Sequence, residues 1–501
     1  MGYQVGESVE VTAESVAQGG WCIGRPAGLP VLFVRHALPG ERVVARVTEA
    51  TSRFARADAV EILRPSPDRV RPPCPHARPG GCGGCDWQHA SLPAQRALKA
   101  AVIGQQLRRL AGVDRAVTVE PLPGDAEPAY GNAGAVPSGA NLPAGGEPAA
   151  GNEPAAGGEP AASGEITARS GTPGLGWRTR VQFAVRDDGA AGLRAHRSHE
   201  VIDVGDCLIA HPRIRELGIP RRRWPGTAAV EAVAGSPGPG GEPAERMVIV
   251  TPAGDAEPGG RPGAGAKAAG SRGRGGVGRF RSEDKGGTQE PTAVPAESVL
   301  RRARRRLTPV RGRAFLSQRA AGREWRVSAG AFWQVHPAAA GALAEAVLAA
   351  TGPQAGDAVL DLYCGVGLFA GVVAPLVGPH GTVIGIESDQ AAVRDARHNL
   401  RDWPWAQVRR GDVAQVLRRG GLPPARLAIA DPPRAGLARE VVDYLSGTPA
   451  TRRFAYVSCD PATLARDIGL LLARGWALEG LRAFDAFPMT HHVECVATLT
   501  R

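Results

Sequence analysis

Long apolar runs are missing from this 501-residue chain, and cysteine is scarce. No stretch of 18 consecutive apolar residues occurs, and the opening sequence MGYQVGESVEV has no basic region followed by an apolar one. The sequence therefore predicts neither a membrane span nor a signal peptide. Gly6 also stands where an N-myristoylation motif needs Ser or Thr. We expect a soluble, cytoplasmic protein with no membrane partner.

The cysteines are too few and too unevenly spaced for a disulfide framework, which favours metal binding or catalysis in a reducing compartment. The 43% of hydrophobic residues is nevertheless enough for two or three packed domains. The eight cysteines are Cys22, Cys74, Cys82, Cys85, Cys207, Cys364, Cys459 and Cys495.

The charge balance is basic, with 60 Lys and Arg against 49 Asp and Glu and a formal net charge of +11. Such an excess is typical of nucleic-acid-binding proteins, although an arginine-rich surface that only contacts solvent has the same composition. The arginines gather in RRR at 221–223 and in RRARRRLTPVRGR at 301–313. Clusters of this kind favour a partner that carries phosphates.

Two stretches of low complexity interrupt the chain. Residues 124–170 contain a hexapeptide repeat, GGEPAA and GNEPAA, without a large apolar residue, and a second Gly- and Pro-rich stretch covers 252–295. We expect both to be disordered, because they bury too little apolar surface to offset the entropy of ordering. Patterned sequence such as WRTRVQFAVRDD lies between them, so we interpret them as insertions in a middle domain.

Short β-like runs separated by glycine turns occupy residues 3–62. They predict a small β-barrel, a fold that often lays nucleic acid across its face. The pattern fits equally well a barrel that only packs on a neighbouring domain. The layout, ALPGERVVARV above all, resembles the OB-like TRAM domain of RNA-modifying enzymes.

Three cysteines are grouped in CPHARPGGCGGCDWQH at C-x7-C-x2-C spacing. The glycine turns let the thiolates of Cys74, Cys82 and Cys85 converge on one metal centre, and Cys207 in VGDCLIAHP is the candidate for a fourth ligand. The spacing leaves open whether zinc or an iron–sulfur cluster binds.

The C-terminal part alternates strand-like and helix-like runs, which predicts a doubly wound parallel sheet with ligands beyond the carboxyl ends of its strands. GVGLFA taken alone also fits an NAD site, because a single glycine fingerprint is weak evidence. Acids at successive strand ends favour another ligand, and the series resembles the S-adenosylmethionine-dependent methyltransferases. These acids are Asp361, Glu387, Asp412 and Asp431.

Cys459 follows the fifth strand-like run, RFAYV, and precedes a segment that opens like a helix. This position at the ligand edge of the sheet favours a nucleophile over a buried filler residue, whereas packing is the preferred role for Cys364 and Cys495. A thiolate is needed for methylation of uracil carbon 5, since its addition to carbon 6 makes carbon 5 nucleophilic. Glu494 in FPMTHHVECV can then act as the base that removes the proton from carbon 5.

Five ordered motifs, FWQVHP, DLYCGVGLF, DPPRAG, SCDPATLARD and DAFPMTHHVECV, resemble those of the RNA 5-methyluridine methyltransferase family. The cysteine group is also similar to the [4Fe–4S] segment of that family. The resemblance implies Cys459 as nucleophile, Glu494 as base and a [4Fe–4S] cluster. It further implies contacts to S-adenosylmethionine from Gln334, Tyr363, Glu387, Asp412 and Asp431.

The sequence departs from the family pattern at three places. Family members often carry asparagine where Leu368 and His336 stand, and they have fewer residues between the first two cysteines. One alternative to this enzyme class is an RNA-binding or assembly protein without catalysis. Another is a zinc deaminase, but its motif is incomplete here because no P-C-x-x-C follows HVEC. Arg434 in DPPR argues against an amino-methylating enzyme, whose motif has an aromatic residue there.

We therefore predict an α/β protein, a monomer acting on transfer or ribosomal RNA, with three domains. They are a TRAM-like barrel at 1–63, an α+β middle domain at 64–325 with the metal segment and both insertions, and a Rossmann-like methyltransferase domain at 326–501.

Overall fold

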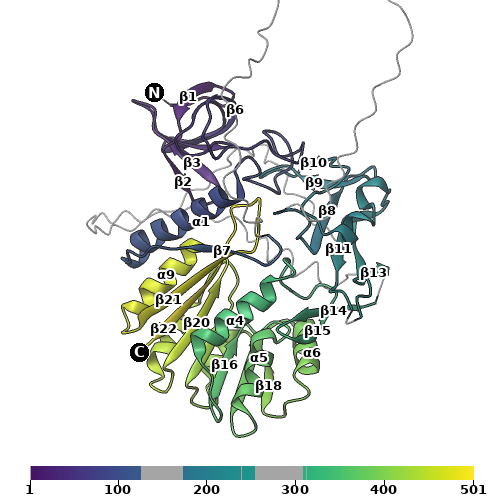
Figure 1. Ribbon diagram of the computed structural model, residues 1–501, viewed down its shortest axis with the longest axis vertical. Helices are drawn as coiled ribbons and strands as arrows, with labels where there is room; N and C mark the ends of the chain where they lie inside the picture. The colour runs from purple at the N-terminus through teal and green to yellow at the C-terminus, as the bar shows by residue number, and fades with distance from the viewer. Residues whose placement is uncertain (1, 126–172, 239, 254–307, 312) are drawn as a thin grey trace, which may run out of the picture.

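The computed structural model describes residues 2–125, 173–238, 240–253, 308–311 and 313–501. The stretches predicted to be disordered, 124–170 and 252–295, lie almost entirely outside these residues, as does much of the arginine-rich stretch 301–313. Within the described ranges, no helix combines the length and the apolar character that crossing a membrane requires. Figure 1 shows the N-terminal sheet at the top, the middle sheet at the right and the C-terminal sheet with its helices below.

The N-terminal strands form one six-stranded sheet in the order β1-β5-β6-β4-β3-β2, wrapped around an apolar core that includes Leu32, Val34 and Val43. In the first half of β5 buried and more exposed residues alternate, as expected for a strand with one face on a core. The strands are β1 (Ser8–Thr12), β2 (Ser15–Ala17), β3 (Trp21–Gly24), β4 (Val31–Arg35), β5 (Arg42–Ala50) and β6 (Phe54–Arg64).

The cysteine segment follows the barrel and leads into helix α1 (Leu92–Gln106). Ser91 begins this helix, because its side chain accepts a hydrogen bond from the Ala94 N–H. The chain continues through a π-turn, η1 (Leu107–Ala111), to strand β7 (Val119–Pro121), which pairs with the C-terminal sheet. Helix α1 consequently lies between the barrel and helix α9 (Figure 1).

The middle part is a six-stranded sheet in the order β10-β9-β8-β11-β12-β13, followed by a separate hairpin of β14 and β15. Short helical turns between β10 and β11 cover its apolar face. The elements are β8 (Arg180–Val185), β9 (Ala191–Arg194), β10 (Val201–Ile202), α2 (Pro212–Arg215), η2 (Ile219–Arg221), β11 (Thr227–Ala234), β12 (Arg246–Pro252), β13 (Thr308–Arg311), β14 (Phe315–Ala320) and β15 (Arg323–Ser328).

The C-terminal sheet confirms the predicted Rossmann-like architecture. Its strand order is β18-β17-β16-β19-β20-β22-β21-β7, with parallel pairing from β18 to β20 and an antiparallel β22 between β20 and β21. The strands are β16 (Ala358–Leu362), β17 (Thr382–Glu387), β18 (Ala406–Arg410), β19 (Leu427–Ala430), β20 (Arg453–Ser458), β21 (Ala477–Asp485) and β22 (Glu494–Thr500).

Helices cover both faces of this sheet, because its strands are apolar on both sides. Neighbouring residues Val359 and Leu360 of β16 belong to two different apolar cores. One core contains α4 (Ala339–Thr351), α5 (Leu368–Val377) and α6 (Gln390–Asn399). The other contains α1, α7 (Val413–Arg419), α8 (Arg439–Gly447) and α9 (Pro461–Leu472).

Candidate active site

The acids expected at strand ends lie along one edge of the C-terminal sheet. Glu387 is the last residue of β17, Asp431 comes directly after β19, and Asp412 follows β18 by two residues. Asp361 is the penultimate residue of β16. Because these strands are parallel neighbours, their carboxyl ends meet at the edge where such sheets bind ligands.

A left-handed turn after β16 faces these acids. Tyr363 and Gly365 have φ values of 63° and 56°, and a Cβ added at Gly365 would meet no atom within 4 Å. The Gly365 N–H donates to Glu387 Oε2 at 3.1 Å, while Glu387 Oε1 accepts from the Asp389 N–H at 2.7 Å. The turn is therefore fixed beside the Glu387 carboxylate and leaves open space over its backbone.

Asp361 and Asp412 both hold helices by their N-termini. Asp361 Oδ2 accepts from the Ala370 N–H at 2.8 Å, and Asp412 Oδ1 accepts from the Gln415 N–H at 3.0 Å. Burial, together with the negative charges of Asp431 and Glu387, raises the pKa of Asp361 to about 8. Its Oδ1 atom is buried without a hydrogen-bond partner among the described residues. An open turn with an unsatisfied buried oxygen suits a polar, cationic ligand.

Cys459 and Glu494 come from adjacent antiparallel strands. Ser458 of β20 pairs with Cys495 of β22, so one further step of the register sets Cys459 opposite Glu494. Cys459 is partly exposed and lies between β20 and Asp460, the residue that caps α9. Glu494 is only 4% exposed. The predicted nucleophile and base therefore meet at the same edge as Asp431.

Burial and mutual repulsion control protonation at this edge. Burial, reinforced by the charge of Glu494, raises the pKa of the Cys459 thiol to about 12, and the Arg434 guanidinium opposes this effect. Burial raises the pKa of Asp431 to about 7, and burial with the Asp431 charge raises the pKa of Glu494 well above its usual value. Burial therefore favours the neutral thiol, and it favours protonation of the two neighbouring carboxyl groups as well.

The N-terminal barrel contacts residues near Cys459 and residues near Glu494. The Gln18 side chain donates to Asp460 Oδ2 at 3.1 Å, next to Cys459. On the other side, Arg35 lies 3.6 Å from Asp86 Oδ1, and Asp86 Oδ2 lies 2.6 Å from His491 Nδ1. The barrel is thus part of the wall around the site.

The four cysteines expected to bind a metal line one cavity of about 380 Å³. They are Cys74, Cys82, Cys85 and Cys207. Burial raises the pKa of each thiol, that of Cys207 to about 11. In the described ranges, no three His, Cys, Asp or Glu side chains are grouped closely enough to hold a metal ion. The size of the cavity suits a group larger than one ion.

Comparisons with known proteins agree with this geometry. Residues 426–501 match the model of the tRNA (uracil-5-)-methyltransferase family, and residues 3–60 match the TRAM domain. Residues 338–415 match the model of protein-L-isoaspartate(D-aspartate) O-methyltransferase, which covers the turn at Gly365 and the strand ends at Glu387 and Asp412. An uncharacterized RNA methyltransferase of Streptomyces coelicolor is 47% identical, over 99% of this chain and 93% of that relative.

A second relative is the 23S rRNA (uracil(1939)-C(5))-methyltransferase RlmD of Pseudomonas putida, 30% identical over 93% of this chain and 88% of that protein. The chain belongs to the RNA (uracil-5-)-methyltransferase family. The same fold occurs in the tRNA (uracil-54, C5)-methyltransferase of Pyrococcus abyssi, which is 20% identical with a TM-score of 0.60 over 98% of this chain and all of that one. The protein is thus an S-adenosylmethionine-dependent RNA (uracil-5-)-methyltransferase.

Two of the residues singled out in this methyltransferase lie in the segment between β15 and α4. Gln334 is buried between β15 and α4 beside Thr179 and Arg180. Within the described chain, no hydrogen bond joins it to the other residues predicted to contact the methyl donor. His336 accepts from the Ala338 N–H at 3.1 Å, so its Nε2 carries the proton and donates to Asp125 at 2.6 Å. His336 therefore has a buried structural role.

Sequence reasoning missed the part played by Arg434. It was used only to exclude an amino-methylating enzyme, yet its charge acts on both Cys459 and Glu494. Its guanidinium lies 3.5 Å from His492 Nε2. The signal was its place directly after the strand-end motif DPP. The predicted burial of Cys364 and Cys495 is confirmed.

Proposed function

We propose that this methyltransferase works through a covalent bond between Cys459 Sγ and carbon 6 of a uridine in structured RNA. The register of β20 and β22 supports this proposal, because it sets a thiol opposite a buried carboxyl group at the ligand edge of the sheet. Arg434 supplies positive charge beside the thiol, which favours the reactive thiolate.

The proposed reaction proceeds by addition, methyl transfer and elimination. The Cys459 thiol first loses its proton to solvent, and the thiolate then adds to carbon 6 while the electrons of the ring double bond move to the carbon 4 oxygen as an enolate. Carbon 5 is then the nucleophile for the methyl group that bound S-adenosylmethionine would supply, and the sulfur would leave as a neutral thioether. Glu494 removes the proton from carbon 5, the bond between sulfur and carbon 6 breaks, and 5-methyluridine leaves with the thiolate restored.

S-adenosylmethionine, when bound, supplies an electrophilic sulfonium methyl group. Glu387 has the position to accept from both ribose hydroxyl groups, and Asp412 has an oxygen for the adenine amine. Tyr363 directly follows β16 in the left-handed turn, and Asp431 directly follows β19 at the same edge, where a carboxylate would suit the positive charge of a sulfonium. We assign the methionine end to Gln334.

The RNA partner is ribosomal or transfer RNA. The relative with 30% identity is named for 23S rRNA, so ribosomal RNA is the first substrate to test. A target in an unpaired loop is expected, because the base must leave its stack to reach Cys459. Sequencing the 5-methyluridine sites in RNA from a strain without the gene identifies the position. We also place the enzyme in the cytoplasm as a monomer.

We further propose that the four cysteines hold a [4Fe–4S] cluster, because their shared cavity of about 380 Å³ has room for one. Bound thiolates would join the cysteine segment to the Cys207 loop of the middle domain. Protein purified without oxygen should then be brown and contain iron and sulfide. Stoichiometric zinc without visible absorbance would overturn this assignment.

The covalent step is tested with RNA that carries 5-fluorouridine at the target. Wild-type enzyme should form an adduct that survives denaturing electrophoresis, because fluorine cannot leave as a proton does. Cys459→Ala should form none, whereas Glu494→Gln should accumulate an adduct with ordinary uridine. Methylation by Cys459→Ala at the wild-type rate, or binding of RNA without any methylation, would refute the proposal.

A further inference from the structure

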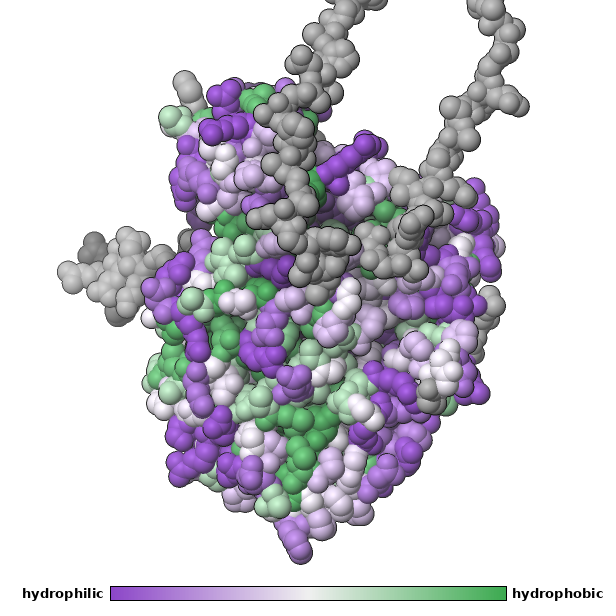
Figure 2. Space-filling view, viewed as in Figure 1, coloured by the Kyte–Doolittle hydropathy of each residue, from purple (hydrophilic) through white to green (hydrophobic). Residues whose placement is uncertain are grey.

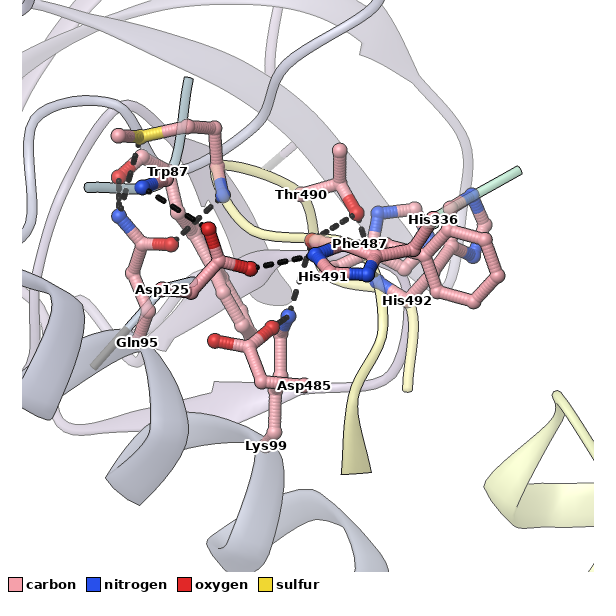
Figure 3. A network of polar contacts seen from close by, with 12 residues as sticks. Trp87, Gln95, Lys99, Asp125, His336, Asp485, Phe487, Thr490, His491 and His492 are labelled. Atoms are coloured by element: carbon pink, nitrogen blue, oxygen red, sulfur yellow. Dashed lines mark hydrogen bonds and ion pairs between the residues drawn. The ribbon is translucent and has the colours of Figure 1, made fainter. Parts of the chain in front are cut away.

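The loop that joins β21 to β22, residues 486–493, ends directly before Glu494. Buried groups of helix α1 and of the cysteine segment surround it, although these lie almost 400 residues earlier in the chain. Figure 3 shows the network, with Gln95 and Lys99 on α1 pointing toward this loop.

Gln95 binds the middle of the loop. Its Oε1 accepts from the Met489 N–H at 2.7 Å, and its Nε2 donates to the carbonyl groups of Trp87 and Ala90 at 3.0 and 2.9 Å. The Trp87 N–H in turn donates to the Met489 carbonyl at 3.0 Å. Met489 has a φ of 69°, which a residue with a side chain rarely adopts. Its surroundings therefore hold it in a conformation that it would not keep alone.

Lys99 binds the start of the loop. It follows Gln95 by four residues, so both side chains lie on one face of α1. Its ammonium group forms a buried ion pair with Asp485, the last residue of β21, and donates to the Phe487 carbonyl at 3.0 Å. Buried ion pairs contribute little net stability but tolerate few alternative geometries. This pair fixes where the loop leaves the sheet.

Cys459 depends on none of these contacts. It lies between β20 and α9, where Asp460 accepts from the Ala462 and Thr463 N–H groups at 3.0 and 2.9 Å. The side chains of Gln95 and Lys99 therefore contact the loop before Glu494, whereas no hydrogen bond or ion pair of either one reaches Cys459 or Asp460 in the described part of the chain.

We infer that Gln95 and Lys99 are positioning residues for Glu494. They hold the loop before β22 in place, so that the Glu494 carboxylate meets the proton on carbon 5. The inference rests on the proposed function, in which Glu494 is the base. Loosening the loop slows proton removal, whereas addition to carbon 6 and methyl transfer continue. The adduct with ordinary uridine then accumulates.

The test uses full-length Gln95→Met and the double variant Lys99→Met/Asp485→Leu, which removes both buried charges together. Single-turnover reactions with radioactive methyl donor and ordinary RNA measure methyl transfer into adduct and release of methylated RNA separately. We expect release to fall roughly tenfold or more, as for small misplacement of a catalytic group, with methyl transfer within about threefold of wild type. Ile103→Ala, one turn further along α1 in an apolar core, is the matched control and should accumulate no adduct.

The outcomes separate the two proposals. If Glu494→Gln accumulates adduct but the α1 variants do not, the positioning role is wrong and the base assignment stands. If the α1 variants slow both steps equally, as Ile103→Ala would by unfolding, the role is only structural. If Glu494→Gln accumulates nothing, the base assignment fails and the positioning role fails with it.

Discussion

At the scale of single residues, Arg434 is the positive charge that acts on the Cys459 thiol. We predict that Arg434→Gln slows adduct formation on 5-fluorouridine RNA by roughly tenfold, because one charge beside a thiol shifts its pKa by about one unit. Arg434→Lys should recover part of this loss. The rate of trapping in single-turnover reactions measures the effect. An unchanged rate in Arg434→Gln would show that another group activates the thiol.

The shared protonation of Asp431 and Glu494 predicts a pH dependence. Glu494 acts as a base only when it is deprotonated. Its raised pKa therefore moves the acid limb of the pH–rate profile above the range in which an ordinary carboxyl group titrates. Release of methylated RNA should accordingly increase with pH above that range. Asp431→Asn, assayed at saturating methyl donor, should move the limb to lower pH, because it removes the charge that adds to burial in raising the pKa of Glu494. A limb at the same pH in both proteins would contradict this coupling.

Residue-level prediction succeeded where the position of a residue follows from a local rule. The position of Cys459 after an apolar strand and the start of α9 at Pro461 could both be predicted from neighbouring residues. The contacts of Asp86 with His491 could not, because the two are 405 residues apart and neither has a local pattern. Arg434 could be read from the DPPR motif. Its effect on Glu494 could not be predicted, because it depends on β22 bringing Glu494 near it in the folded chain.

At the scale of elements, the ion pair of Lys99 and Asp485 connects α1 to the end of β21. We predict that Lys99→Met alone lowers the free energy of unfolding by about 3–5 kcal/mol, because it leaves the carboxylate buried without a partner. The double variant Lys99→Met/Asp485→Leu should recover most of this loss. Urea unfolding of the three proteins measures both effects. Equal losses in the single and double variants would show that packing, not charge, matters here.

The five βα units could be predicted because each repeats a strong local pattern of apolar strand and amphipathic helix. Strand β7 could not. It has only three residues, Val119–Pro121, and it is a strand only because β21 offers an edge for pairing. The order of β22 between β20 and β21 likewise depends on tertiary pairing.

At the scale of the whole molecule, the flanks of residues 126–172 lie together. Asp125 Oδ1 accepts from the Gly174 N–H at 3.3 Å while its Oδ2 binds His336. Replacing 126–172 with a short Gly-Ser linker should therefore leave the melting temperature and methylation nearly unchanged. Each doubling of the length of such a connection changes the free energy of loop closure by only about 0.6 kcal/mol. Asp125→Ala, which removes both contacts, should lower the melting temperature.

That replacement also tests whether the stretch contributes to RNA binding. A large loss of RNA affinity with an unchanged melting temperature would show that it does. Binding should be compared at fixed salt, because affinity for RNA falls steeply as salt rises.

The contacts of the barrel with Asp460 and, through Asp86, with His491 have a consequence for target choice. They hold the barrel at a fixed distance from the Cys459 sulfur. If RNA binds to the barrel, we expect a uridine to be modified only when the fold of its RNA puts it at that distance from the bound strand, and an identical sequence at another distance to be left unmodified.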